Sequence, residues 1–334
     1  MTIIHALAIL CITIPAMTEE IVNRDQDFTI PTVIRTAHPD VMTIPADVVM
    51  PVLEPGDPRP GTLVLQQLPT YAGTTIAHTV YLPTDWIPGQ QYPVMVEYLG
   101  NTAQVRDVKA IGPGLHGGQP FIWVILPFIA TDHTRDLDWW WGDVEATVAY
   151  AKEAVPAICR QWGGDPDRVV LVGYSRGAIA CNYIGLHDEA IAKLWRGMMA
   201  ISHYDDGHIP WGMTPEEQQL APERVRRLGR IPQYIAAEHC TPTYTPPKDL
   251  LQQLHERNIV TFDQAESEFH LQPVQLWEKT RRFLRLHQPQ GQFTFADLPW
   301  VNHESACLLR DTPERHHMRA WLAHVISPGY HHDR

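Results

Sequence analysis

The feature that most restricts the fold of this chain is the Gly-Tyr-Ser-Arg-Gly segment at residues 173–177. An apolar run, Val169–Val172, precedes this segment, and small residues that suit the start of a helix, 178–181, follow it. A G-x-S-x-G between a strand and a helix forms a nucleophile elbow, a tight turn that exposes the serine hydroxyl at the edge of a sheet. Glycines are needed because a side chain at 173 or 177 would collide with the turn or hold the helix away from the strand. The segment therefore predicts Ser175 as a nucleophile.

Beyond residue 60, the order of the apolar segments predicts an α/β fold in one catalytic domain, residues 61–330. Two strand-like segments come first, and strands and helices then alternate. This order implies a mostly parallel central sheet of about eight strands with helices on both faces. The predicted strands are 62–68, 75–82, 93–98, 121–127, 169–172, 197–202, 232–237 and 292–298, and the predicted helices are 143–159, 215–228, 273–286 and one that Thr312 caps.

The N-terminal residues suggest export. Residues 3–17 are almost wholly apolar, and polar sequence begins at Thr18. Such a run is too short to span a bilayer but suits a signal peptide, although it carries no Lys or Arg, and a buried strand is the alternative. We expect residues 1–17 to be a signal peptide and 18–60 to be a loosely structured leader. A secreted or periplasmic protein, with no stable membrane insertion after signal removal, is the expectation.

Composition and charge exclude some partners. The net charge of −12 argues against nucleic acid, because no basic stripe offsets the repulsion from phosphates. We expect no metal, since the histidines do not form the i, i+4 His-Glu pattern of a zinc helix. Residues 112–117 match G-x-G-x-x-G, but a predicted strand follows the match instead of preceding it. We therefore expect no nucleotide and no other cofactor.

The element order and two flanking motifs resemble the α/β-hydrolase superfamily over about residues 60–327. The motifs are Tyr81-Leu82-Pro83 before Tyr92–Val96, and residues 165–169 before the elbow. They are similar to esterase-D-type, feruloyl-esterase and polyester-depolymerase-like enzymes. The resemblance implies a serine hydrolase that cleaves carboxylic esters through an acyl-enzyme intermediate.

Its substrate would be a small-molecule or polysaccharide-linked ester, with plant-polysaccharide and phenolic esters as one class. A serine peptidase of the prolyl-oligopeptidase type and a catalytically silent binding protein of the same fold are the alternatives.

In this superfamily the triad follows the chain order Ser, acid, His. His303 follows the last predicted strand and precedes the terminal helix, where the resemblance expects the base. Glu238 is the first carboxylate after the strand 232–237, and we predict it as the acid. Asp205 and Asp206, after the preceding strand, are alternative acids.

The resemblance also predicts an oxyanion hole of two backbone N–H groups, each contributing about 3–4 kcal/mol to lowering the barrier. Arg176, the residue after the nucleophile, supplies one. Asn101, just after the strand 93–98, is predicted to supply the other, with Thr102 as a second choice. The Arg176 side chain could bind a substrate carboxylate or form a structural ion pair.

Aromatic residues gather where this fold places the substrate. We predict substrate contacts from Trp140, Trp141, His203 and Tyr204, with packing in the core as the alternative for each. The loop-rich insertion 239–272 could form a lid.

Four cysteines remain once Cys11, in the predicted signal, is set aside. In the resemblance-based triad, the loops after Glu238 and His303 meet, which suggests a Cys240–Cys307 disulfide. A Cys159–Cys181 bridge between adjacent helices is a second suggestion, and buried free thiols are the alternative.

Overall fold

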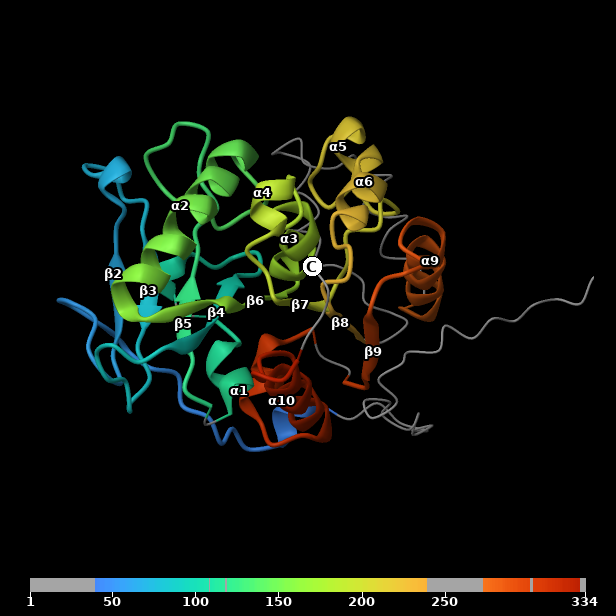
Figure 1. Cartoon of the computed structure of the whole chain (residues 1–334). Helices are drawn as coiled ribbons and strands as arrows, with labels where there is room; N and C mark the ends of the chain where they lie inside the picture. Colours follow the sequence, from blue (N-terminus) through green and yellow to red (C-terminus); the bar gives the residue numbers. More distant parts are fainter. Residues whose placement is uncertain (1–39, 108, 118, 239–272, 301–302, 331–334) are drawn as a thin grey trace, which may run out of the picture.

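The computed structural model describes residues 40–107, 109–117, 119–238, 273–300 and 303–330. Three predicted segments lie outside these residues: the signal peptide 1–17, the first part of the leader and the possible lid 239–272. Cys11 and Cys240 lie outside them as well. Helix labels follow Figure 1.

A nine-stranded sheet runs through the described residues in the order β1-β2-β3-β5-β4-β6-β7-β8-β9. It is mostly parallel, and β3 alone runs antiparallel to both of its neighbours, β2 and β5. The strands are β1 (Leu53–Glu54), β2 (Leu63–Gln66), β3 (His78–Tyr81), β4 (Tyr92–Tyr98), β5 (Ile122–Ile125), β6 (Gly164–Tyr174), β7 (Gly197–Ser202), β8 (Gln233–Glu238) and β9 (Phe293–Leu298). The prediction of a mostly parallel sheet is confirmed.

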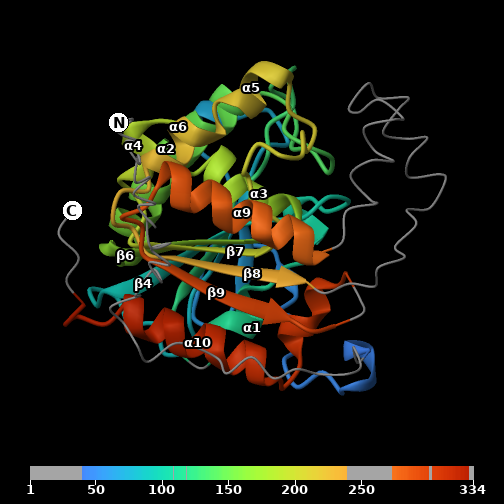
Figure 2. The same cartoon turned by 90° about the vertical axis from the view of Figure 1, so that its right-hand side faces the viewer.

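Helices cover both faces of this sheet (Figures 1 and 2). One face carries α2, α3, α4, α5, α6 and α9, and the opposite face carries α1 and α10. The bounds are α1 (Gly112–His116), α2 (Val144–Trp162), α3 (Arg176–Tyr183), α4 (Glu189–Ala192), α5 (Pro215–Gln219), α6 (Ala221–Arg226), α9 (Pro273–His287) and α10 (Pro313–Val325).

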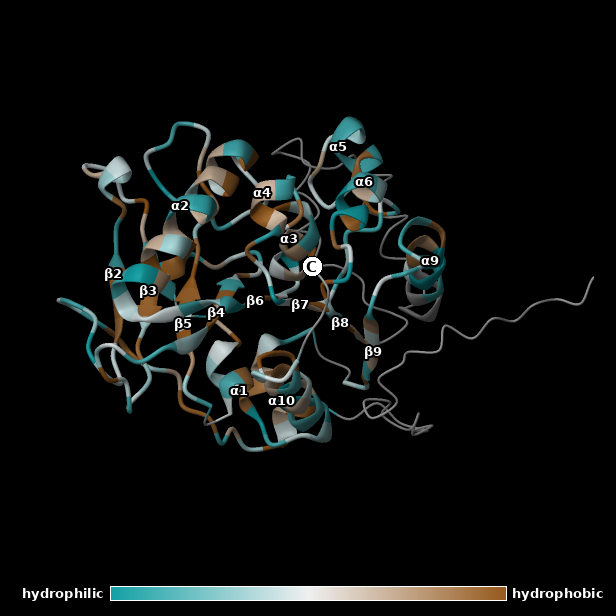
Figure 3. Ribbon diagram, viewed as in Figure 1, coloured by the Kyte–Doolittle hydropathy of each residue, from teal (hydrophilic) through white to brown (hydrophobic). Residues whose placement is uncertain are grey.

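Because helices lie on both sides, successive residues of one strand enter two different cores. Val169 and Leu171 of β6 belong to the core under α2 and α3, whereas Val170 and Val172 belong to the core under α10. The inner stretches of the central strands, such as Val169–Val172 of β6, are therefore apolar at successive positions, and Figure 3 shows brown stretches within the sheet. This is why they could be recognised as continuous apolar runs.

Most predicted elements lie close to their observed bounds, and two differences have local causes. The helix predicted over 215–228 is two helices, because α5 ends at Gln219 and α6 begins at Ala221 with Pro222 in its first turn. Glu238 is the last residue of β8, not part of the following loop. The predicted cap of α10 is confirmed, since the Thr312 Oγ1 accepts from the Arg315 N–H at 3.2 Å.

The described part of the leader, residues 40–60, packs against the domain through several contacts, among them a strand pairing and an ion pair. β1 pairs with β2 and adds a strand at the edge of the sheet. The Asp47 carboxylate receives two hydrogen bonds of 2.6 Å from the Arg315 guanidinium on α10. The sheet thus begins before residue 61.

The predicted disulfide between Cys159 and Cys181 is wrong. Both residues are buried free thiols, and Cys307 is a buried free thiol as well. The Cys181 Sγ points toward β7, where it donates to the Met199 carbonyl at 3.4 Å. Burial raises the pKa of Cys159 to about 11. These thiols therefore pack as small apolar side chains.

None of the helices in the described residues combines the length and apolar character needed to cross a bilayer.

Candidate active site

Ser175 lies at the turn between β6 and α3, with φ 56° and ψ −122°. Few non-glycine residues adopt such a backbone, and strained residues of this kind occur mostly at functional sites. The flanking glycines make the turn possible. A Cβ on Gly173 would lie 2.1 Å from the Gly177 carbonyl oxygen, and one on Gly177 would lie 1.9 Å from the Tyr98 carbonyl oxygen. The elbow geometry predicted from the sequence is present.

His303 and Glu238 lie next to Ser175 in the predicted order. The His303 Nε2 is 3.1 Å from the Ser175 Oγ, and the His303 Nδ1 is 2.6 Å from the Glu238 Oε2. Ser175 follows β6, Glu238 ends β8 and His303 follows β9. The carboxyl ends of these strands lie at the same edge of the sheet. With its proton on Nδ1, the imidazole donates to Glu238 and leaves Nε2 free to accept the serine proton.

Exposure differs along this chain of hydrogen bonds. The His303 side chain is 37% exposed, whereas the Glu238 side chain is 6% exposed. The His303 ring is therefore partly open to solvent, while Glu238 is shielded behind it.

Two further side chains donate to Glu238. The Tyr174 hydroxyl donates to Oε1, and the Ser202 hydroxyl donates to Oε2 at 2.9 Å. Sequence reasoning missed both residues. The alternation of β6 does place Tyr174 on the face opposite the elbow helix, and Ser202 ends a strand at the same sheet edge as Ser175.

Burial and pairing oppose each other at Glu238 and His303. Burial alone would raise the pKa of Glu238, but the His303 charge and the hydrogen bonds from His303 and Tyr174 outweigh it and lower the pKa to about 2. Burial alone would lower the pKa of His303, but the Glu238 carboxylate raises it above the usual 6.5. The pair is therefore arranged to stabilise an imidazolium.

The alternative acids have other partners. The Asp205 carboxylate accepts from the Arg224 Nε at 2.6 Å and from its second terminal nitrogen at 2.9 Å. The Asp206 carboxylate accepts from the Thr280 hydroxyl at 2.6 Å and from the His208 N–H at 3.0 Å. Since the His303 Nδ1 is already bonded to Glu238, neither aspartate is the acid partner.

The two backbone segments that carry the predicted oxyanion donors lie next to Ser175. The Arg176 N–H is the first amide of α3, and a Cβ on Gly100 would lie 3.5 Å from the Ser175 Cβ, which brings the loop of Asn101 to the nucleophile. Thr102 does not fit as the second choice, because its N–H donates to the Asp138 carbonyl at 2.7 Å.

The Arg176 side chain neither reaches outward for a substrate nor forms an ion pair in the described residues. It is 1% exposed and its guanidinium lies 4.1 Å from the centre of the Phe128 ring. It donates instead to four backbone carbonyls, those of Leu99 at 3.3 Å, Gly100 at 3.0 Å, Ala103 at 3.2 Å and Trp140 at 2.9 Å. Burial lowers its pKa to about 9, so it stays charged at neutral pH and ties together the loops around Asn101.

Two of the four predicted substrate-contact residues belong to the core instead. Trp141 is 4% exposed and its indole donates to the Trp211 carbonyl at 2.7 Å. Tyr204 is 5% exposed and its hydroxyl donates to Gln233 at 2.7 Å. Trp140 and His203 are half-buried, and the His203 ring lies 5.1 Å from that of His303. The last two remain candidates for substrate contact.

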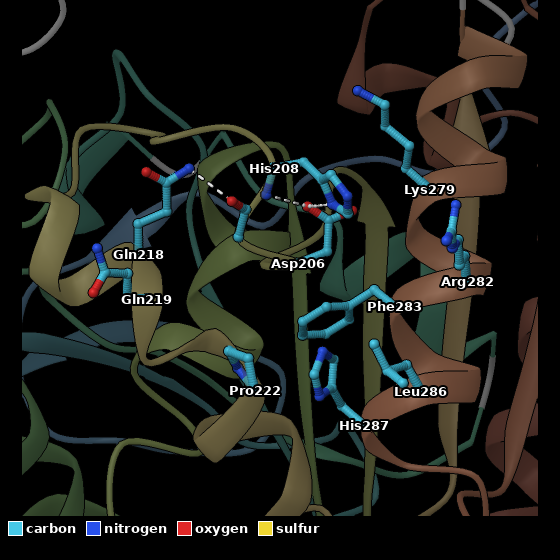
Figure 4. Close-up of a pocket in the computed structure, with 11 residues that line it drawn as sticks. Asp206, His208, Gln218, Gln219, Pro222, Lys279, Arg282, Phe283, Leu286 and His287 are labelled. Carbon is cyan, nitrogen blue, oxygen red and sulfur yellow. Dashed lines mark hydrogen bonds and ion pairs between the residues drawn. The ribbon is translucent and has the colours of Figure 1, made fainter.

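A separate pocket lies between the α5–α6 segment and α9 (Figure 4). Its lining includes Asp206, His208, Lys279, Arg282 and Phe283. Ser175, Glu238 and His303 are not part of it.

Proteins of known structure share this architecture. A hyperthermophilic esterase from the archaeon Pyrobaculum calidifontis aligns with 80% of this chain and 86% of its own, at 13% identity and a TM-score of 0.50. A mutant of the esterase Est22 aligns with 79% of this chain and 80% of its own, at 14% identity and a TM-score of 0.50. The chain has the α/β-hydrolase fold. At such identities the likeness establishes the fold alone.

A thermostable esterase aligns with 78% of this chain at 13% identity and a TM-score of 0.43, and the chain spans 61% of its length. No family model matches the sequence, and no curated protein does either. Within this α/β-hydrolase fold the elbow strand β6 lies inside the sheet, between β4 and β7.

Proposed function

We propose that the protein is a serine hydrolase that cleaves carboxylic esters through an acyl-enzyme intermediate. One observation carries the proposal: an unbroken line of hydrogen bonds runs from the Ser175 Oγ through both nitrogens of His303 to Glu238. A serine hydroxyl is a weak nucleophile until a base accepts its proton, and the base needs a partner that fixes its tautomer.

In the first half-reaction, Ser175 Oγ attacks the ester carbonyl while His303 Nε2 takes the serine proton. The Arg176 and Asn101 N–H groups stabilise the negative charge that develops on the carbonyl oxygen. His303 then gives the proton to the leaving alcohol, and the acyl group stays on Ser175. Glu238 stabilises the imidazolium that exists between these two steps.

In the second half-reaction, water takes the place of the alcohol. His303 accepts a proton from the water, whose oxygen attacks the acyl carbon. Collapse of the tetrahedral intermediate returns the proton to Ser175 Oγ and releases the carboxylic acid.

The substrate class we propose is a small or polysaccharide-linked ester, phenolic esters included. Support comes from the half-buried rings near His303. His203 lies 5.1 Å from His303 and 4.5 Å from Trp211, ring centre to ring centre. Rings at the rim of a site suit stacking on the flat part of a substrate.

Labelling with a fluorophosphonate probe tests the proposal, because the probe forms a bond only with an activated serine. We expect the wild-type protein to be labelled and to hydrolyse short p-nitrophenyl esters, and Ser175→Ala to do neither. Feruloyl and acetyl-sugar esters then test the substrate class. Labelling with peptide cleavage alone would favour a peptidase, and an absence of labelling would favour a binding protein.

The proposal extends to export directed by residues 1–17. Expression of the full chain in a bacterial host should yield an extracytoplasmic protein that has lost these residues. Recovery of the protein with Met1 intact in the cytoplasm would contradict it.

A further inference from the structure

We propose that Tyr174 and Ser202 are positioning residues that hold the Glu238 carboxylate in its working orientation against His303. The inference rests on the proposed function, since it assigns a role within the same triad. Nothing in the sequence motif assigns a role to either residue.

The geometry uses both oxygens of the carboxylate. Oε1 accepts from the Tyr174 hydroxyl, and Oε2 accepts from Ser202 at 2.9 Å and from His303 at 2.6 Å. Donors on both oxygens fix the plane of the carboxylate as well as its position. One donor on one oxygen would leave the group free to rotate.

The two donors and the acid come from three neighbouring parallel strands. Tyr174 ends β6, Ser202 ends β7 and Glu238 ends β8. The register pairs Tyr174 with Ile201 and Ser202 with Ala237, so the sheet itself sets the spacing of the three side chains. Such backbone-anchored donors are preorganised and need no loop to order them.

Glutamate needs this support more than aspartate would. Its side chain has one more rotatable bond, so fixing it in one rotamer costs more conformational entropy. Hydrogen bonds to a charged group are stronger than those between neutral groups, and two of them oppose that loss and hold one rotamer of Glu238.

Ser202 adopts a strained backbone to take part. Its φ is 88°, in the region that glycine adopts freely and that strains other residues. The Ser202 Oγ also lies 2.6 Å from the His203 Nδ1, so it accepts from His203 while it donates to Glu238. A glycine would adopt this backbone without strain, but it would lack the hydroxyl that donates to Glu238.

The titratable groups around Glu238 and His303 determine the sign of the expected pH effect. Burial, followed by the charge of His303, lowers the pKa of His203 to about 3, so His203 is neutral near pH 7. Removing a donor lets the carboxylate rotate away from the His303 Nδ1, which weakens its stabilisation of the imidazolium and lowers the pKa of His303. The groups that face the pair are Tyr174, His203, Glu304 and Cys307.

The experiment compares Tyr174→Phe and Ser202→Gly with the wild-type enzyme. We expect each to lower kcat on a p-nitrophenyl ester by about 10- to 100-fold with little change in KM. We expect the pKa of His303, from NMR titration of the imidazole, to fall by roughly half a unit or more. Ser202→Gly should keep or raise the melting temperature, because it relieves the backbone strain.

Tyr98→Phe is the matched control. It removes a hydroxyl that is buried on β4 and has no hydrogen-bond partner in the described residues. We expect Tyr98→Phe to leave kcat, KM and the His303 titration unchanged. If the loss of any buried hydroxyl had a general effect, Tyr98→Phe would change kcat and the His303 titration as much as Tyr174→Phe does.

Unchanged kcat and an unchanged His303 titration in both variants would overturn the positioning role while the ester hydrolase remains. A wild-type protein that neither hydrolyses esters nor reacts with the probe would instead overturn the proposed function. The NMR titration would still decide in that case whether the two hydroxyls act on the pair. If Tyr174→Phe does not fold, Ser202→Gly carries the test alone.

Discussion

The carboxylates at the ends of two adjacent strands, Asp205 after β7 and Glu238 at the end of β8, have similar burial and different partners. Asp205 is 1% exposed and Glu238 is 8% exposed. Asp205 meets the buried guanidinium of Arg224. Glu238 meets an imidazole whose other nitrogen faces a serine hydroxyl.

The partner, and not burial, therefore distinguishes a structural carboxylate from the acid of the proposed triad. Burial raises the pKa of Asp205, and Arg224 opposes that rise. The two side chains bond to each other and not to His303. The pKa of Glu238 is lowered to about 2, chiefly because His303 outweighs burial. Only the second carboxylate faces a group whose charge would appear and disappear in the proposed reaction.

The largest expected effect is on turnover, in Glu238→Gln. The amide keeps the size of the side chain but cannot stabilise the imidazolium, and it favours the wrong tautomer. We expect kcat to fall by about 10⁴-fold, as in other serine triads that lose the acid charge. Steady-state kinetics on a p-nitrophenyl ester measures the change. A loss smaller than tenfold would remove Glu238 from the triad.

The next effect is on stability, in Asp205→Asn. This change leaves the Arg224 charge buried without its counter-ion, and we expect the free energy of unfolding to fall by about 3–5 kcal/mol. Urea unfolding followed by tryptophan fluorescence measures it.

The folded fraction of Asp205→Asn should retain nearly full kcat. The double variant Asp205→Leu/Arg224→Met, which removes both charges, is the control and should recover most of the lost stability. If instead Asp205→Asn remained as stable as the wild type and lost turnover as Glu238→Gln does, Asp205 would not be a structural carboxylate and would take part in the reaction.

The smallest effect is on the pH profile. Protonated His303 cannot accept the serine proton, so kcat/KM falls as pH drops through the pKa of His303, which Glu238 holds above 6.5. Glu238→Gln removes that charge and leaves burial, which lowers the pKa. The acidic limb of the residual activity should therefore move to lower pH by about one unit or more. A limb that stays in place would mean that another group titrates.

Much of the fold could be predicted because the strands are short apolar runs between turn residues. The strand over residues 197–202 has the bounds that the sequence indicates, and the terminal helix begins at its predicted cap. Less of the candidate site could be predicted from the sequence. Trp141 and Tyr204 look like substrate-contact residues in the sequence, but each finds a partner inside the protein, Trp211 for one and Gln233 for the other.

Arg176 illustrates the same limit. Its place after the nucleophile predicts the role of its N–H, which belongs to the backbone of the elbow. Its side chain turns inward to carbonyls around Gly100 and to Trp140, which are far away along the chain. No pattern near residue 176 encodes those contacts.

By itself the sequence determined the elbow at Ser175 and the order of the strands, because tight turns and apolar runs impose their demands on neighbouring residues. Tertiary packing brings Glu238 and not Asp205 to His303, places the Tyr174 and Ser202 hydroxyls on that carboxylate, and leaves Cys159, Cys181 and Cys307 as free thiols. Those outcomes depend on the register of strands distant in the chain, and a difference of a few ångströms there decides which polar atoms form hydrogen bonds.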